Sequence, residues 1–301
     1  MNVLKNEERR SAALVQSSAA YMHSAVPVTL MQMRMYTPAL PLSLFVDCFW
    51  YLSGYRPSHA KELTFPDGSV EIVIDLRGDP IRLFDREDRE LDFGGAVLCG
   101  PHSDYFIIDT ADEAEVVGIH FKPGGAYPFL NLPLYELHNA HVSLDLLWGA
   151  SARELREELL EAATIDDKFG ILAKRLMALA AKPLVPQPSV RYALDKLRDC
   201  SFTGTVADVV GEIGMSHNRF NQIYKAEVGM SQKRSSRLFR FQQVLHLIGS
   251  GREIDWSAVA LHCGYYDQAH FIKDFQSFSG INPSVYRPLP GRHHNHAVYR
   301  A

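Results

Sequence analysis

Polar side chains at helical spacing in the C-terminal third of the chain are the residues with the clearest chemistry. A predicted helix over residues 217–227 carries amides and a cation at positions i, i+3, i+4 and i+7: Asn218, Asn221, Gln222 and Lys225. Side chains of these types pair with purine edges and phosphates in the major groove of DNA. A single polar stripe is more often a solvated helix face, so the surrounding elements decide between the two interpretations.

The residues before and within this helix predict how it is positioned. Valine and isoleucine at helical spacing indicate a first helix over residues 205–213. Gly214 can adopt the left-handed conformation that ends a helix, and Ser216 can cap the next one. Phe220 and Tyr224 then face a core. This is the pattern of a helix-turn-helix unit, which in a single copy is often only a packing motif.

The same layout recurs 51 residues further along the chain. Phe271 corresponds to Phe220 and Phe275 to Tyr224, with Gly264 at the turn. Such correspondence at one fixed offset indicates a duplicated unit. The outer face of the second helix is less polar than that of the first, and it offers these candidate DNA contacts: Gln268, Ala269, His270 and Lys273.

One long helix is predicted between the two copies, over residues 231–250. It carries Arg234, Arg237 and Arg240 at three-residue spacing. A rigid connector of this length can place two recognition helices in successive turns of the major groove, which repeat at about 34 Å. Two copies, a connector and basic side chains together favour DNA binding over plain packing.

Charge is divided unevenly along the chain of 301 residues, whose formal net charge is −4. Residues 186–301 hold 14 Lys and Arg against 9 Asp and Glu, whereas residues 1–185 hold 17 against 26. This asymmetry is expected when one half meets nucleic acid, although drift in surface charge can produce it as well. The net charge of the whole chain is therefore negative although its C-terminal part is basic.

Prolines separate the two halves, because a helix cannot continue through Pro183, Pro186 and Pro188. Upstream, short β-rich runs alternate with turn residues, and two amphipathic helices follow them, capped by Ser151 and Asp166. We expect an α+β protein, with an N-terminal antiparallel β-sandwich or barrel plus helices and a C-terminal all-α tandem helix-turn-helix domain. The expected parts are a flexible arm (1–33), a sensor or dimerisation domain (34–182), a linker (183–188), a DNA-binding domain (189–290) and a flexible tail (291–301).

The second copy resembles the signature of AraC-type transcriptional regulators. The resemblance lies in Gly-Tyr-Tyr-Asp-Gln-Ala-His-Phe-Ile-Lys-Asp-Phe over residues 264–275 and in Gly-Ile-Asn-Pro-Ser-Val-Tyr-Arg over 280–287. The first copy is similar, but the chain departs from the family at Gln232, usually proline, and Ser235, usually aromatic. The resemblance implies a DNA-binding transcription factor, an activator rather than a repressor. It also implies base contacts from Asn218, Asn221, Gln222, Gln268, Ala269, His270 and Lys273.

Residues 63–71 and 118–129 resemble, less closely, the uncharacterised sensor-like domain that often precedes this DNA-binding unit in bacterial regulators. The resemblance implies a cupin-like architecture and a small-molecule effector. The candidate effector-binding residues are Trp50, Phe65, Asp67, His102 and His120. The alternative is purely structural, because Pro66-Asp67-Gly68 is a turn sequence and aromatic residues in strands more often belong to the core.

Enzymatic chemistry has little support in the sequence. The histidines His59, His102 and His120 stand alone rather than in a closely spaced metal-binding set. The four cysteines form no Cys-x-x-Cys pair: Cys48, Cys99, Cys200 and Cys263. We therefore expect no enzyme activity, no metal and no cofactor.

The expected partners are double-stranded DNA, a small-molecule effector, RNA polymerase and a second copy in a homodimer. No apolar run approaches 18 residues, so we expect no membrane span and a cytoplasmic location. Two alternatives stay open. In the first, the protein is an enzyme of cupin-like fold that carries the C-terminal helices as an appendage. In the second, the N-terminal half binds no effector and only dimerises.

Overall fold

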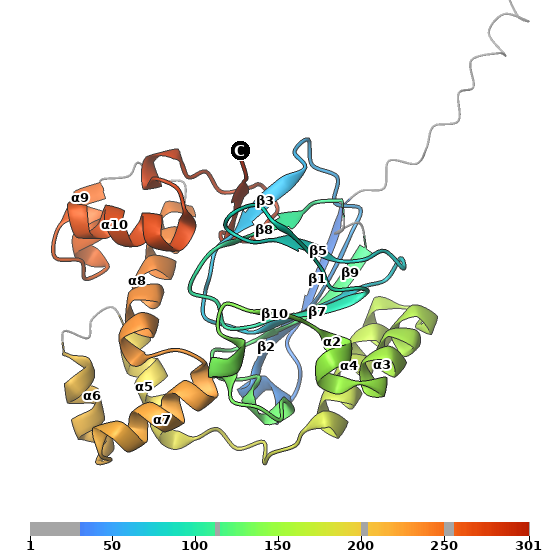
Figure 1. Ribbon diagram of the computed structural model, residues 1–301, viewed down its shortest axis with the longest axis horizontal. Helices are drawn as coiled ribbons and strands as arrows, with labels where there is room; N and C mark the ends of the chain where they lie inside the picture. The colour runs from blue at the N-terminus through green and yellow to red at the C-terminus, as the bar shows by residue number, and fades with distance from the viewer. Residues whose placement is uncertain (1–30, 112–114, 200–203, 250–255, 301) are drawn as a thin grey trace, which may run out of the picture. The chain divides into compact units, whose positions relative to one another are not determined.

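The computed structural model describes residues 31–111, 115–199, 204–249 and 256–300. Residues Gln32–Ala301 form one compact unit. Residues 1–30 of the predicted arm and Cys200 lie outside the described residues. An antiparallel β-structure is followed along the chain by helices, which confirms the predicted fold class (Figure 1).

Six antiparallel strands form the larger sheet, in the order β1-β2-β9-β4-β7-β10. They are β1 (Gln32–Tyr36), β2 (Val46–Ser53), β9 (Glu115–Phe121), β4 (Glu71–Asp75), β7 (Ala96–Cys99) and β10 (His141–Ser143). Both faces of β2 are covered, which explains its nearly continuous apolar sequence. β1 begins two residues inside the segment predicted as a flexible arm, because its backbone pairs with β2 from Gln32 onward.

Five strands form the smaller sheet, in the order β11-β3-β8-β5-β6. They are β11 (His296–Val298), β3 (Lys61–Thr64), β8 (Phe106–Asp109), β5 (Arg82–Phe84) and β6 (Glu90–Asp92). The edge strand β11 lies in the C-terminal segment, residues 291–301, that was expected to be a flexible tail. That prediction is wrong for residues 296–298, because they pair with β3.

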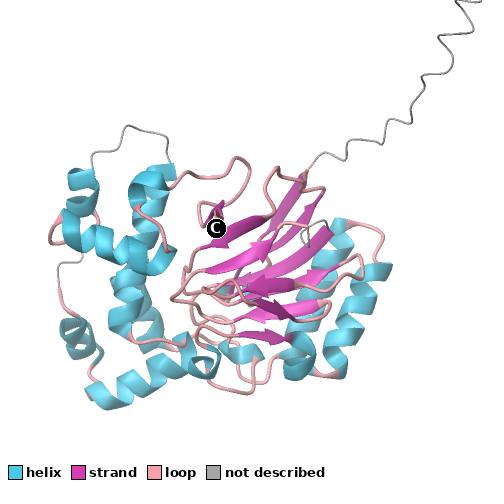
Figure 2. Ribbon diagram, turned by 45° about the horizontal axis from the view of Figure 1, so that its top comes forward, coloured by secondary structure: helices cyan, strands magenta, loops and turns pink. Residues whose placement is uncertain are grey.

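The two sheets pack face to face and enclose apolar side chains. Leu83 and Phe106 from the smaller sheet, with Ile81 just before β5, pack in one cluster with Val97 and Cys99 from the larger sheet. Helices lie on both sides of this sandwich in Figures 1 and 2. The layers are therefore helix, larger sheet, smaller sheet and helix.

Helices cover the outer face of the larger sheet: α2 (Leu144–Trp148), α3 (Ala150–Glu161) and α4 (Ile165–Leu179). Leu155 and Leu172 from these helices pack against Phe49 and Ile119 of the sheet. The predicted caps are wrong by a few residues. Gly149 precedes α3, and Thr164, whose side chain accepts from the Asp167 amide, caps α4. Two short 3-10 turns, η2 (Tyr127–Phe129) and η3 (Leu134–Leu137), come before α2 in the chain.

The C-terminal helices confirm the predicted duplication. They are α5 (Pro188–Arg198), α6 (Val206–Ile213), α7 (His217–Val228), α8 (Gln232–Gly249), α9 (Trp256–His262) and α10 (Gln268–Ser279). Gly214 is left-handed with φ 71°, and the Ser216 side chain caps α7. Asp267 caps α10 in the same way, accepting from the His270 amide at 2.7 Å. The connector α8 carries both units.

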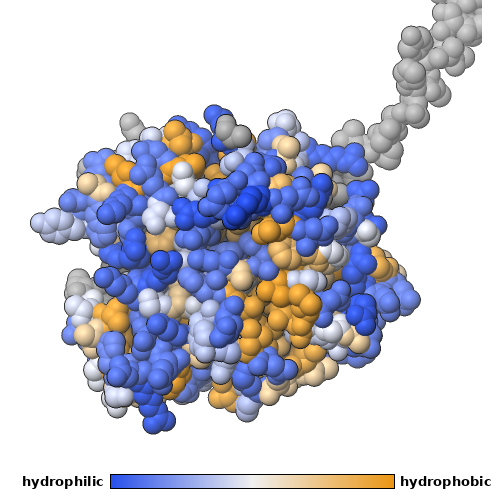
Figure 3. All heavy atoms as spheres, in the orientation of Figure 1, coloured by the Kyte–Doolittle hydropathy of each residue, from blue (hydrophilic) through white to orange (hydrophobic). Residues whose placement is uncertain are grey.

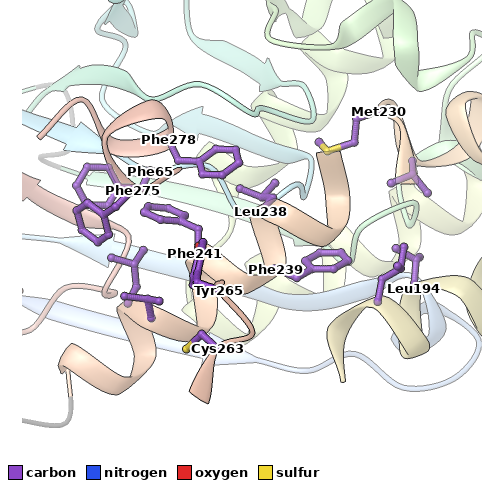
Figure 4. Packing of buried hydrophobic residues seen from close by; sticks show 14 of the residues in the cluster. Phe65, Leu194, Met230, Leu238, Phe239, Phe241, Cys263, Tyr265, Phe275 and Phe278 are labelled. Atoms are coloured by element: carbon purple, nitrogen blue, oxygen red, sulfur yellow. The ribbon is translucent and has the colours of Figure 1, made fainter. Parts of the chain in front are cut away.

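These helices share an apolar core with the smaller sheet. Phe65, directly after β3, lies 6.1 Å from the ring of Phe241 on α8 and 5.8 Å from that of Tyr286. Figure 4 shows Phe65 among Phe275, Phe278 and Phe241. Burial of such rings is the main favourable contribution to packing. No helix in the described part of the chain is long and apolar enough to span a membrane.

Candidate nucleic-acid interface

The first predicted stripe lies on an accessible face of α7. Asn218, Gln222 and Lys225 are exposed and Asn221 is half-buried. The opposite face places Phe220 and Tyr224 in the core. The structure therefore brings all four polar residues onto one face, and the surface over α6 and α7 is mostly hydrophilic in Figure 3. Among the described residues, none makes a side-chain hydrogen bond or ion pair with these four, so they are available to an external partner.

The second predicted stripe on α10 is only partly available. Gln268, Ala269 and Lys273 are exposed. His270 is half-buried, and its Nε2 lies 3.7 Å from Oδ2 of Asp274. The imidazole also meets the Tyr265 ring edge-on at 5.3 Å. These contacts tie His270 to its own helix-turn-helix unit, whereas no such side-chain contact is found for Gln268 and Lys273 among the described residues.

A groove of 1040 Å³ separates the two units. Its walls include Asn221 and Lys225 from α7 and His270 from α10. Its floor includes Lys233 and Arg237 from the connector. Cationic and amide side chains of both units thus converge on one concave surface, which suits the phosphate backbone of a nucleic acid.

The connector arginines have partners inside the protein. Arg237 donates two hydrogen bonds to the carboxylate of Asp274, at 2.7 and 3.2 Å, and Asp274 is almost fully buried. Arg240 donates to the carbonyl oxygen of Gly264 at 3.0 Å, and Arg234 donates to the hydroxyl of Ser103. These three arginines therefore hold the helices in place.

Three of the five candidate effector residues meet at one end of the sandwich. The imidazole of His120 lies 3.2 Å from the carboxylate of Asp67 and 3.5 Å from that of Glu71. Trp50 donates its indole N–H to Glu71 at 2.8 Å. Burial disfavours the charged imidazole, but Asp67 and Glu71 outweigh it and raise the pKa of His120 well above its usual range.

The other two candidates lie elsewhere. Phe65 belongs to the core shared with the C-terminal helices. His102 is buried against His141 and Phe106, with ring centroids 4.4 and 4.9 Å apart. Burial, followed by the nearby His141, lowers the pKa of His102 well below its usual range. The structure does not bring these two side chains together with Trp50, Asp67 and His120.

A cleft of 620 Å³ opens beside the Asp67–His120 pair. The sandwich contributes Asp67, His120 and Lys122 to its walls. The C-terminal helices contribute Arg198, and the tail contributes His293. Lys122, Arg198 and the imidazole of His120, whose pKa is raised, stand against the two carboxylates of Asp47 and Asp67 along this surface. A small organic anion is the kind of molecule that such walls can hold.

Two family models match parts of the chain. A domain of unknown function, DUF6597, matches residues 34–143, and a helix-turn-helix domain matches residues 209–288. The second match spans both units and the connector between them. The C-terminal region therefore contains a helix-turn-helix domain.

One relative of similar sequence is an uncharacterised HTH-type transcriptional regulator of Haemophilus influenzae. It is 34% identical over 134 residues, which are 44% of this chain and 39% of that relative. The chain thus covers 39% of that relative's length. The name of that relative describes a helix-turn-helix protein, and the family model that matches residues 209–288 is likewise a helix-turn-helix domain.

Solved structures with a similar chain trace include ToxT from Vibrio cholerae. One crystal structure of ToxT is 12% identical with a TM-score of 0.45, covering 84% of this chain and 96% of that chain. Another, of ToxT with an unsaturated fatty acid bound, is 14% identical with a TM-score of 0.43, covering 75% and 90%.

Two buried carboxylates that hold parts of the protein together were not predicted from the sequence. Glu62 on β3 is fully buried and binds Arg292 and His296 from the tail. Asp274 on α10 is nearly as buried. The sequence around these carboxylates gives no signal for burial, because each lies directly after a lysine, and it does not name the partner. Among the described residues, no three His, Cys, Asp or Glu side chains are grouped to hold a metal ion.

Proposed function

We propose that this protein is a sequence-specific, DNA-binding transcriptional regulator of the AraC type. One observation carries the proposal: α7 and α10 present exposed polar stripes on either side of a groove lined by lysine and arginine. Amides can select base edges while cations neutralise phosphates, so the two kinds of side chain supply specificity and affinity separately. Asn218, Asn221, Gln222 and Lys225 are the proposed contacts from α7. The proposed contacts from α10 are Gln268, Ala269, His270 and Lys273.

The test is selection of genomic DNA fragments by the full-length protein, followed by affinity measurements on a selected fragment and on random DNA. Replacing Asn221 and Gln222 with Ala should reduce the ratio of the two affinities at least tenfold, since bidentate base contacts each contribute about 1–3 kcal/mol. An unchanged ratio would remove α7 from base recognition.

A charge variant separates phosphate contacts from base contacts. Lys225→Ala should weaken binding to both DNAs about equally and lower the slope of log affinity against log salt by about one. The matched control is Arg153→Ala, which removes an exposed cation from α3. Equal salt slopes in the two variants would contradict a phosphate contact at Lys225.

The proposal includes an effector site in the 620 Å³ cleft beside Asp67 and His120. The cationic walls favour a small organic anion, held by Arg198 and Lys122. A panel of carboxylates and neutral polyols of equal size tests this by thermal shift. Carboxylates alone should raise the melting temperature, and Arg198→Ala should abolish the increase. Stabilisation by the polyols would contradict an anion site.

Because the duplicated unit resembles that of AraC-type regulators, we further propose that the protein activates transcription, forms a homodimer and contacts RNA polymerase. A reporter gene placed behind a selected fragment tests the direction of regulation. Expression should rise with the protein present. A fall in expression would indicate a repressor.

A further inference from the structure

The C-terminal tail returns from the DNA-binding region to the sandwich. Its strand β11 pairs antiparallel with the edge strand β3, with His296, Ala297 and Val298 opposite Thr64, Leu63 and Glu62. The pairing extends beyond the strand, because the Phe65 amide donates to the Asn295 carbonyl at 2.8 Å and the Tyr299 amide donates to the Lys61 carbonyl at 3.1 Å. The tail thereby covers a sheet edge that would otherwise expose unpaired backbone groups.

A buried carboxylate fastens this strand. Glu62 on β3 is completely inaccessible to solvent. From the tail, Arg292 lies 3.3 Å and His296 3.1 Å from its Oε2. From the sandwich, His59 lies 2.7 Å from Oε1, and the Tyr55 hydroxyl donates to the same oxygen. A buried carboxylate is costly without such partners, so the tail completes the site of Glu62.

The sandwich also touches both helix-turn-helix units. Gly229, at the end of α7, lies so close to Pro101 that a Cβ there would be 2.3 Å from the proline ring. Gly280, at the end of α10, is as close to Tyr105. On α8, Gln242 donates to the Pro66 carbonyl at 2.6 Å. The sandwich therefore supports α7, α8 and α10 together, while the polar stripes stay exposed.

We propose that residues 289–300 form a latch: by adding β11 to the edge of β3 and pairing Arg292 and His296 with Glu62, the tail holds the two helix-turn-helix units on the sandwich. Held in this way, α7 and α10 keep a fixed spacing, and DNA binding does not have to order them. The latch thus raises affinity for DNA, a consequence that rests on the proposed function. The latch itself does not depend on that function.

The test combines two readouts on the full chain. In the variant R292A/H296A, hydrogen exchange of the Phe65 amide should become at least tenfold faster, because its acceptor is on the tail. Binding to a DNA fragment selected by the wild-type protein should weaken about three- to tenfold. Arg300→Ala, an exposed change on the same tail, is the control and should alter neither measurement.

An engineered disulfide between β11 and β3 should restore the attachment of the tail in a variant that lacks Arg292 and His296. Thr64 and His296 face each other at a pair that exchanges no backbone hydrogen bonds, where Cβ atoms approach most closely. In R292A/T64C/H296C, oxidation should restore slow exchange and wild-type affinity, and reduction should remove both.

Results other than these contradict the proposal, and each result identifies the part that fails. Unchanged exchange in R292A/H296A means that Glu62 does not fasten the tail. Fast exchange with equal or tighter DNA binding means that the latch does not organise the two units. A disulfide that links two chains shows that the tail belongs to a second copy. If the wild-type protein selects no DNA, the proposed function fails, and exchange with the disulfide still decides whether the latch forms.

Discussion

At the scale of single residues, the polar side chains of the C-terminal region divide into two groups. Arg234, Arg237 and Arg240 each donate to a partner within the protein. Among the described residues, the amides and lysines of the outer stripes have no such partner, and all of them except the half-buried Asn221 are exposed. Sequence spacing could predict the stripe because helical period alone decides which residues share a face. It could not predict the arginine partners, because these lie on other helices and loops.

Asp274 is a buried polar residue whose loss should be costly. Asp274→Ala removes the acceptor of two hydrogen bonds from Arg237, and Arg237 is left with an unpaired charge that is partly buried. We expect a loss of about 2–3 kcal/mol in the free energy of unfolding, measured in urea.

The control for Asp274 is Gln276→Ala, an exposed change on the same helix. It should stay within about 0.5 kcal/mol of the wild type. Equal effects of the two substitutions would show that the Arg237–Asp274 pair does not stabilise the fold.

At the scale of elements, two left-handed glycines allow a matched comparison. Gly214 ends α6 with φ +71° and has open space around it. Gly229 ends α7 with φ +85° and lies against Pro101 and the carbonyl of Leu134. Gly214→Ala should cost about 1 kcal/mol, the strain of a side chain in this backbone conformation.

Gly229→Ala should cost about 3 kcal/mol or more, because the added methyl group also collides with Pro101. Thermal or urea unfolding of both variants measures the difference. Equal costs would mean that the contact between α7 and the sandwich adds nothing to stability.

The helices were predictable and several strands were not, for a physical reason. The second recognition helix is fixed locally by its cap Asp267 and by aromatic residues at helical spacing. Strands β3, β6, β10 and β11 have three or four residues each and were not predicted. Such short strands form only when a distant partner supplies their hydrogen bonds, so nothing within three residues specifies them.

At the scale of the whole molecule, the attachment of the tail should depend on pH. Glu62 faces Tyr55, His59, Arg292 and His296. Burial favours the neutral acid, but His296 and Arg292 outweigh it and lower the pKa of Glu62 from 4.5 to about 2. A lowered carboxylate pKa stabilises the fold above pH 4.5, and the effect is lost as the pH falls towards 2.

Glu62→Gln should therefore lower the free energy of unfolding by about 3 kcal/mol at pH 7 and by progressively less below pH 4.5. Burial, followed by Arg292, lowers the pKa of His296 from 6.5 to about 4. Its neutral form belongs to the folded state, so acidification from pH 6.5 to 4 also weakens the attachment. Urea unfolding from pH 7 to pH 4 measures both effects, and a constant difference between wild type and Glu62→Gln would contradict the role of Glu62.

The duplicated helix-turn-helix unit, the connector and the helix face that carries Asn218 and Gln222 could all be predicted from the order of the residues. These features follow from local rules, namely helical period, glycine and side-chain caps, and a repeat at fixed offset. The core that Phe65 shares with α8, and the pairing of Glu62 with Arg292, 230 positions further along the chain, are visible only in the folded protein. Burial and β-pairing join residues that are distant in sequence, and no local pattern encodes which distant residue will be the partner.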